Sequence, residues 1–199
     1  MLLLLFAIPA DDCSAQTPPP LDEHAFERVP PTVVKRLATR FSLGAFVGRF
    51  EETPLGAVRK AVGEGTIQNQ GDAGGSIYWL CYRRAQHRLW VMSGEMGGTD
   101  HRVTEVVEEL TEKDTETSTD CAIIPEKFAP LVFDGKLRLG MSRLEVVTAL
   151  GQPSKSAAAQ MVYSHHGKLA GGFEETAWLI LRFREEKLVF LRGGKTTTN

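Results

Sequence analysis

The segment from Leu139 to Pro153 constrains the fold most, because it carries both the start and the stop signals of a short helix. Ser142 is a favourable N-cap, and Glu145 three residues later completes a capping box, in which each side chain accepts a hydrogen bond from the other residue's backbone N–H. Gly151 suits the left-handed position after a helix, and a proline then prevents continuation. The sequence therefore predicts a helix over residues 143–150, with an apolar stripe at helical spacing formed by Leu144, Val147 and Leu150.

A weaker copy of this helix lies in the first half of the chain, from Thr53 to Gly63. Thr53 is the expected N-cap, Pro54 suits the first helical position, and Gly63 ends the helix. After each helix comes a polar connection, followed by three runs rich in β-branched and aromatic residues, which are typical of strands. These runs are residues 77–83, 88–93 and 102–107, and residues 160–164, 177–183 and 187–191. We therefore expect an α+β fold of two tandem helix-plus-antiparallel-meander repeats, with the helices packed on one face of the sheet.

The N-terminus predicts export from the cytoplasm. Its first ten residues form an apolar run that is too short to span a bilayer but suits the core of a signal peptide, and Cys13-Ser14-Ala15 before Gln16 could form a cleavage site. A periplasmic or secreted location follows. The expected domain order is an export signal (1–15), a Pro-rich linker and lead-in (16–50), a first repeat (51–110), a connection (111–135) and a second repeat (136–195).

Two cysteines remain if Cys13 leaves with the signal, namely Cys81 and Cys121. An even pair in an exported chain predicts a disulfide, and the alternative is two buried free thiols in a cytosolic protein. Neither cysteine belongs to a C-x-x-C motif, so redox chemistry and a zinc site are poorly supported.

The charged and polar residues give little indication of catalysis. The formal net charge is -2 and the Lys and Arg residues are scattered, which argues against nucleic-acid binding. We predict no enzymatic activity, no metal and no cofactor. The alternative is a small hydrolase or ligand-binding enzyme centred on Glu95 and His101, which are close enough in sequence to meet across a loop as a general acid/base pair.

The segment 139–153 and the strands after it resemble a known family. The pattern Leu-Gly-Met-Ser-Arg-x-Glu-Val-x-x-x-Leu-Gly-x-Pro, followed by an antiparallel meander, is similar to the small outer-membrane assembly lipoproteins of the SmpA/OmlA type. Two such units in tandem resemble the β-lactamase inhibitor protein. The resemblance implies an α+β fold and an exported, non-enzymatic role in binding another protein.

Aromatic residues on the expected strands are the stronger functional signal. Side chains alternate between the two faces of a strand, so the face that does not pack against the helices could present Tyr78, Tyr82, Trp90 and Trp178 to a partner. The alternative is that these rings pack in the core. We therefore expect a non-enzymatic cell-envelope protein that binds a protein partner through its sheet surface and loops, with a peripheral association with the outer membrane. A purely structural envelope component is a further alternative.

Overall fold

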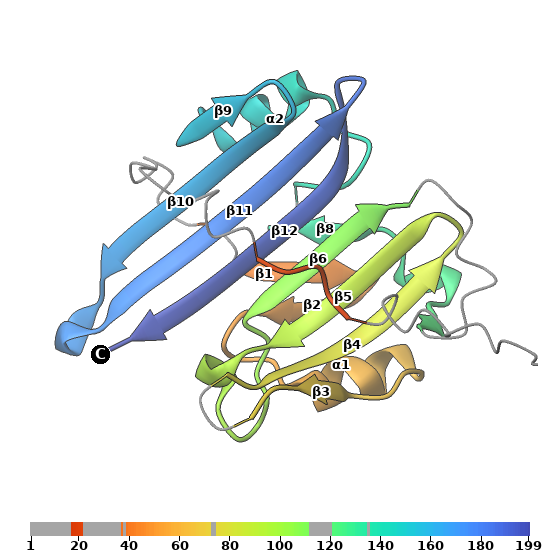
Figure 1. Ribbon diagram of the computed structural model, residues 1–199, viewed down its shortest axis with the longest axis vertical. Helices are drawn as coiled ribbons and strands as arrows, with labels where there is room; N and C mark the ends of the chain where they lie inside the picture. The colour runs from red at the N-terminus through yellow and green to blue at the C-terminus, as the bar shows by residue number, and fades with distance from the viewer. Residues whose placement is uncertain (1–16, 22–36, 38, 73–74, 112–120, 135) are drawn as a thin grey trace, which may run out of the picture.

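A large antiparallel sheet dominates the computed structural model, which describes residues 17–21, 37, 39–72, 75–111, 121–134 and 136–199 (Figure 1). The sheet has nine strands in this described part. Eight follow the order β3-β4-β5-β6-β12-β11-β10-β9, and a ninth, β7, pairs in parallel with β4. The strands are β3 (Gln68–Gln70), β4 (Ile77–Arg84), β5 (His87–Ser93), β6 (Glu105–Leu110), β7 (Ala122–Ile123), β9 (Lys155–Ala157), β10 (Gln160–Lys168), β11 (Glu174–Arg184) and β12 (Lys187–Thr198).

The pairing of β6 with β12 joins the two halves of the chain into this single sheet. On one side lies the meander β4-β5-β6, and on the other lies the meander β10-β11-β12. The two inner strands run antiparallel, with Glu105 opposite Gly194 and Glu109 opposite Phe190. Backbone hydrogen bonds therefore continue across the boundary between the halves.

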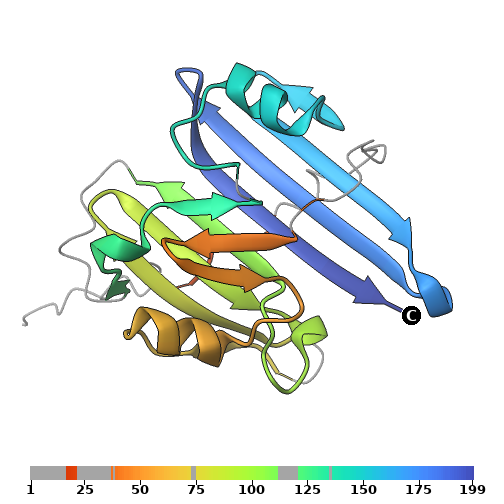
Figure 2. The ribbon, with the colours of Figure 1, turned by 180° about the vertical axis from the view of Figure 1, so that it is seen from behind.

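A second, three-stranded sheet and two α-helices cover one face of the large sheet, which we call the helix face (Figure 2). The small sheet has the order β2-β1-β8. Three short 3-10 helices complete the described elements. The covering elements are β1 (Arg40–Leu43), β2 (Phe46–Arg49), β8 (Leu131–Phe133), α1 (Leu55–Val62) and α2 (Arg143–Leu150), and the 3-10 helices are η3 (Glu95–Gly97), η4 (Glu126–Phe128) and η5 (Ala170–Gly172).

The core is divided by the large sheet into two clusters. The larger one lies on the helix face, where side chains of β1, β8 and α1 meet those of the sheet strands. The smaller cluster lies on the opposite face, which we call the outer face. It consists of Trp79, Cys81, Trp90, Met92, Val107, Cys121, Val162, Ile180 and Phe190.

The predicted α+β class with tandem helix-packed repeats is wrong, because the protein is mostly antiparallel sheet. Each of the two described α-helices has only eight residues. The middle of the helix face is covered instead by the β2-β1-β8 sheet, which contributes Phe41, Leu43, Leu131 and Phe133 to the core. Residues 40–49, which lie in the predicted lead-in, therefore supply two strands of this covering layer.

Helix α2 begins and ends at the predicted residues, but Gly151, with φ 86° and ψ -167°, is not in the left-handed helical conformation that its sequence suggests. The Ser142 hydroxyl accepts a hydrogen bond from the Glu145 N–H, and Glu145 Oε2 accepts one from the Ser142 N–H at 2.7 Å, so the capping box is complete. The predicted apolar stripe is less accurate. Val146 is the buried residue of the helix, whereas Leu144 is 75% exposed. Apolar residues surround so much of this short helix that the sequence alone does not select the buried side.

Replacing Ser142 with alanine is expected to lower the free energy of unfolding by about 1 kcal/mol, because the backbone N–H of Glu145 loses its acceptor. Urea unfolding measures the change. Thr148→Ala is the control in the same helix, since the Thr148 hydroxyl only donates to the Leu144 carbonyl and such bonds add little stability. Equal stability of Ser142→Ala and the wild type would contradict the role of the cap.

The predicted export signal, residues 22–36 of the predicted linker and lead-in, and residues 112–120 of the predicted connection lie outside the described residues. The domain boundaries therefore stay predictions. Among the described residues, no helix has both the length and the apolar character needed to cross a membrane.

Candidate functional site

The outer face of the sheet carries a continuous row of side chains from both halves of the chain. Successive cross-strand partners lie directly opposite one another, so the row crosses β4, β5, β6, β12, β11 and β10. Its members are Cys81, Trp90, Val107, Arg192, Ile180 and Val162. Arg192 is thus a charged residue in the middle of an apolar row.

A short N-terminal segment, residues 17–21, crosses this row, and we call it the strap. Figure 1 shows it in red on the outer face, and Figure 2 shows α1, α2 and the small sheet on the other side. Three consecutive prolines, residues 18–20, favour an extended polyproline conformation without internal hydrogen bonds. Pro18 is buried, and the strap borders a hollow of about 350 Å³ beside Arg88 and Trp90.

The strap is held to the sheet through its backbone. Arg192 Nη1 donates a hydrogen bond of 2.7 Å to the carbonyl oxygen of Pro19. Proline has no N–H, so its carbonyl oxygen is its only backbone hydrogen-bonding group. An arginine that donates to a main-chain carbonyl can therefore bind an extended segment independently of the side chains of that segment.

Glu105 holds this arginine in place. Arg192 donates to both carboxylate oxygens of Glu105, from Nε to Oε1 at 2.5 Å and from Nη2 to Oε2 at 2.8 Å. Both side chains are almost fully buried, with exposed fractions of 5% and 11%. A two-pronged, desolvated pair of this kind fixes the guanidinium plane and directs its remaining N–H groups. It therefore orients Nη1 toward the strap.

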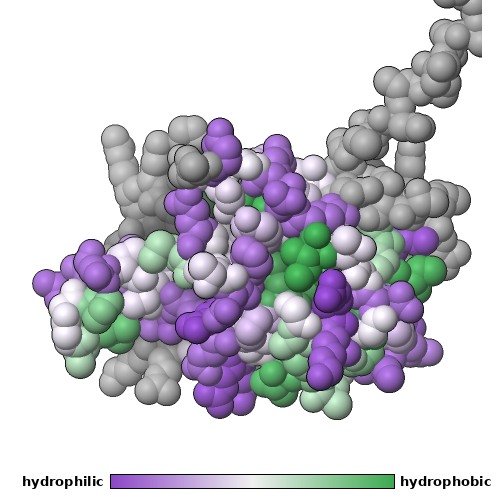
Figure 3. All heavy atoms as spheres, turned by 90° about the horizontal axis from the view of Figure 1, so that it is seen from below, coloured by the Kyte–Doolittle hydropathy of each residue, from purple (hydrophilic) through white to green (hydrophobic). Residues whose placement is uncertain are grey.

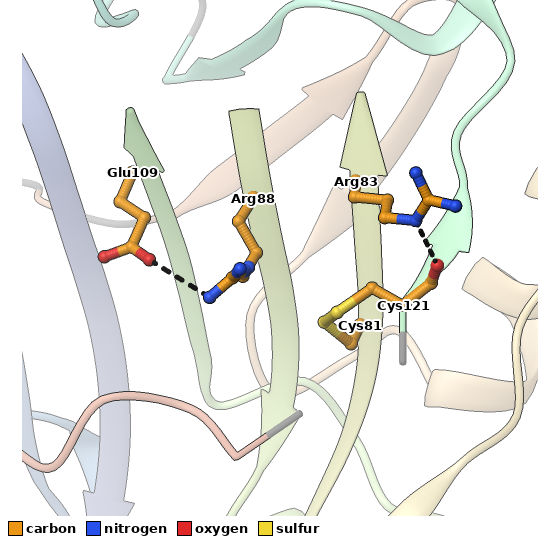
Figure 4. Close-up of a disulfide and its surroundings, with 5 residues drawn as sticks. All are labelled: Cys81, Arg83, Arg88, Glu109 and Cys121. Carbon is orange, nitrogen blue, oxygen red and sulfur yellow. Dashed lines mark hydrogen bonds and ion pairs between the residues drawn. A yellow bond between two sulfur atoms is a disulfide. The ribbon is translucent and has the colours of Figure 1, made fainter. Parts of the chain in front are cut away.

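The predicted disulfide between Cys81 and Cys121 is confirmed, with a Cα–Cα distance of 4.8 Å. Figure 4 shows the bond at the end of the outer-face row. Arg83 Nε donates to the Cys121 carbonyl at 3.0 Å, and β7 pairs with β4 immediately after this cysteine. Figure 4 also shows the ion pair between Arg88 and Glu109, at 3.8 Å on neighbouring strands. The disulfide therefore attaches the segment after residue 120 to β4.

The four aromatic residues predicted to bind a partner do not form one surface. Tyr78 and Tyr82 point to the helix face, whereas Trp90 and Trp178 belong to the outer face. Tyr82 and Trp90 are core residues, with exposed fractions of 0% and 1%, so their rings are not exposed to a partner in this structure. Tyr78 and Trp178 are half-buried; Tyr78 stacks on the His101 ring, with the ring centroids 3.8 Å apart.

Trp178 lies flat over a glycine of the neighbouring strand. A Cβ atom added to Gly194 would overlap the Trp178 ring. The other exposed apolar residues lie on several parts of the fold, and the face in Figure 3 is largely hydrophilic with separate hydrophobic patches. They are Leu21, Val47, Met96, Ile123, Leu144, Leu169 and Phe173. No broad aromatic patch is therefore present on the described surface.

The alternative enzymatic site is not assembled in the described part of the chain. Glu95 lies in η3, and the described contacts include no hydrogen bond or ion pair between it and His101. The described residues also contain no group of three or more His, Cys, Asp or Glu side chains placed to hold a metal ion.

Sequence reasoning missed the three charged residues that are buried in the described part of the chain, namely Glu105, Glu108 and Arg192. Each lies at a strand position that alternation places on a buried face. A charged residue at such a position is unusual, and this is the signal that could have identified all three. Glu108 lies on the helix face, with Oε1 at 3.1 Å from His87 Nδ1. Its other oxygen, Oε2, has no hydrogen-bond partner among the described residues.

Burial raises the pKa of the Glu108 carboxyl, and the contact with His87 lowers it only in part. The folded protein therefore holds this proton more tightly than the unfolded chain, so stability decreases as the pH rises from about 4.3, the ordinary glutamate pKa, to the raised value. Glu108 lines a pocket on the helix face, together with Arg83, Arg84 and Glu126.

Replacing Glu108 with glutamine is expected to remove this decrease and to raise the free energy of unfolding at neutral pH by about 1 kcal/mol. Urea unfolding at several pH values measures the difference from the wild type, which should shrink in acid. The exposed Glu174→Gln variant is the control. A difference that is constant with pH would contradict the assignment to Glu108.

No protein-family model matches the chain, and no curated protein matches it either. The chain is similar to a solved structure from Streptococcus mutans, described as a "putative beta-lactamase inhibitor protein". The two share 11% identity over 74% of this chain and 83% of the other, with a TM-score of 0.26. A TM-score this low carries no argument about this chain, and the resemblance to the SmpA/OmlA family stays a prediction.

Proposed function

We propose that this is a non-enzymatic binding protein of the cell envelope, which holds an extended segment of a partner protein on the outer face of its sheet. The partner segment takes the place that the strap occupies, across β5, β6 and β12. The strap is then an internal ligand that a partner displaces.

The hydrogen bond from Arg192 to the Pro19 carbonyl is the observation that carries this proposal. The contact is to the main chain, so another extended segment could accept the same hydrogen bond. Trp90 and Arg88 beside the strap offer a flat apolar ring and a cation, with the guanidinium carbon 5.7 Å from the centre of the ring. Aromatic-lined grooves of this kind suit proline-rich segments, whose extended conformation costs little entropy to fix.

Two features support export. The apolar run at the start of the sequence has the composition of a signal-peptide core. A disulfide such as Cys81–Cys121 is typical of proteins that fold in oxidising compartments. A periplasmic or secreted protein with a peripheral outer-membrane association agrees with both features.

Photo-crosslinking in the native cell tests the proposal. A photo-reactive amino acid in place of Arg88, which borders the strap, should give an adduct with a second protein. The matched control places the same amino acid at Leu144, which is exposed on α2 on the helix side of the sheet. An adduct from position 88 and none from position 144 is the expected result.

Removal of the strap, residues 17–21, should increase the yield of that adduct, because the partner no longer competes with it. If position 88 gives only internal links to the strap, or if the yield does not change when the strap is removed, the proposal is wrong. A structural component with no partner would give the first of these results.

We do not propose the hydrolase alternative. The ring of His101 is stacked on Tyr78, and the described contacts give it no carboxylate to act with.

A further inference from the structure

A second hollow lies on the helix face of the sheet, whereas the strap lies on the outer face. It opens between the end of the β4-β5 hairpin, η4 and β8, and has a volume of about 490 Å³. This lies within the ~300–1,000 Å³ typical of small-molecule sites. Most of its walls are apolar, formed by Leu43, Leu89, Ile124, Phe128 and Leu131. An apolar molecule of small size would fit such walls.

One polar group in this pocket lacks a partner. Glu108 is only 4% exposed, and its Oε2 accepts no hydrogen bond from the described residues, while Oε1 is 3.1 Å from His87 Nδ1. Nearly all buried polar atoms in proteins are hydrogen-bonded, and an exception calls for an explanation. A ligand that donates to Oε2 would supply one.

The arginines of the pocket are directed to other acceptors. Arg84 Nη2 donates to Glu126 Oε1 at 2.9 Å, and Arg83 Nε donates to the Cys121 carbonyl at 3.0 Å. Neither of these bonds reaches Glu108. Among the described residues, His87 is therefore the side chain that contacts this carboxylate, and a cationic donor would be favoured over a neutral one.

The geometry also selects the kind of cation. His87 already contacts Oε1, so Oε2 is the oxygen that is left without a donor among the described residues, and the two-pronged geometry of a guanidinium is of less use here than at an open carboxylate. An ammonium group is a compact donor that needs only one oxygen. We propose that this pocket binds a small primary amine with an apolar tail, whose ammonium group donates a hydrogen bond to Glu108 Oε2. Burial raises the pKa of the Glu108 carboxyl, and the bound ammonium compensates the buried negative charge.

Calorimetric titration of the full chain with hexylamine tests this proposal. Saturable binding is expected. The neutral analogue 1-hexanol has the same tail without the charge, and its affinity should be lower by a factor of about ten or more. Glu108→Gln should weaken hexylamine binding by about tenfold or more, because the charged acceptor is lost. The matched control is Glu109→Gln, which removes the same charge from the next residue of β6, on the outer face.

A second variant keeps the carboxylate and fills the space. Ala129 lines the pocket and is half-buried, so Ala129→Leu should reduce the binding of hexylamine while Glu108 stays in place. Failure of the wild type to bind hexylamine at millimolar concentration would overturn the proposal. So would equal binding of hexanol and hexylamine, unchanged binding to Glu108→Gln, or unchanged binding to Ala129→Leu.

Discussion

Replacing Arg192 with methionine is expected to lower the free energy of unfolding by about 3–5 kcal/mol. The change leaves the buried Glu105 carboxylate without the two hydrogen bonds that it accepts from this arginine. An unpaired charge at such a depth costs far more than the pair itself contributes, because the desolvation penalty remains after the attraction is lost. Urea unfolding monitored by tryptophan fluorescence measures the loss.

The double variant Arg192→Met, Glu105→Leu should regain most of this stability, since no buried charge is then left unpaired. Arg88→Met is the matched control. Its partner Glu109 is 3.8 Å away and both side chains are partly exposed, so its loss should be below about 1 kcal/mol. Equal losses for Arg192→Met and Arg88→Met would contradict the special position of the buried pair.

Removing the disulfide by changing both Cys81 and Cys121 to alanine is expected to cost about 4 kcal/mol. The bond joins residues that are 40 positions apart, and closing a loop of this length restricts the unfolded chain strongly. Denaturant unfolding of the oxidised wild type and of the double variant measures the difference. The double variant should not respond to reducing agent, whereas the wild type should lose a similar amount. A loss below about 1 kcal/mol in both experiments would show that the bond contributes little.

The strands of the two meanders could be predicted from the sequence, because each has its own local pattern, whereas the short strands β1, β2, β3, β7, β8 and β9 were not predicted. The runs at 77–83 and 88–93 correspond to β4 and β5, and the run at 177–183 lies inside β11. Helix α2 was predictable for the same reason, since its caps lie within fifteen residues of sequence. In the first helix the N-cap is Pro54 instead of Thr53, whose hydroxyl accepts a hydrogen bond from the Arg49 N–H.

Strand β12 extends past residue 191, where the predicted run ends, and includes two glycines. A glycine pair after Leu191 suggests a break in a strand. In the structure the strand continues to Thr198, and the missing Cβ atoms make room for other rings. Phe133 packs against Gly193 from one face, and Trp178 packs against Gly194 from the other. Close packing of neighbours from distant parts of the chain is not visible in a local pattern.

The candidate site could not be predicted for a similar reason. Glu105 and Arg192 are 87 positions apart, and they meet only because β6 pairs with β12. The sequence gives two meanders but does not say which of their edges join. The strap contact is more distant still, since Arg192 and Pro19 are 173 positions apart. The aromatic residues could not be assigned to an exposed face from the sequence. Alternation along a strand shows which residues share a face, but it does not show which face other elements cover.

The junction between β6 and β12 also determines the order in which the molecule can be completed. A chain that is synthesised or translocated from its N-terminus presents β6 long before β12 is available to pair with it. During that interval the first meander ends in an open strand edge, whose free N–H and C=O groups can pair with another chain. Pairings between residues as distant as Glu105 and Gly194 also form slowly. The last strand of the chain therefore protects the first half from aggregation, and a product truncated before residue 187 is expected to be insoluble.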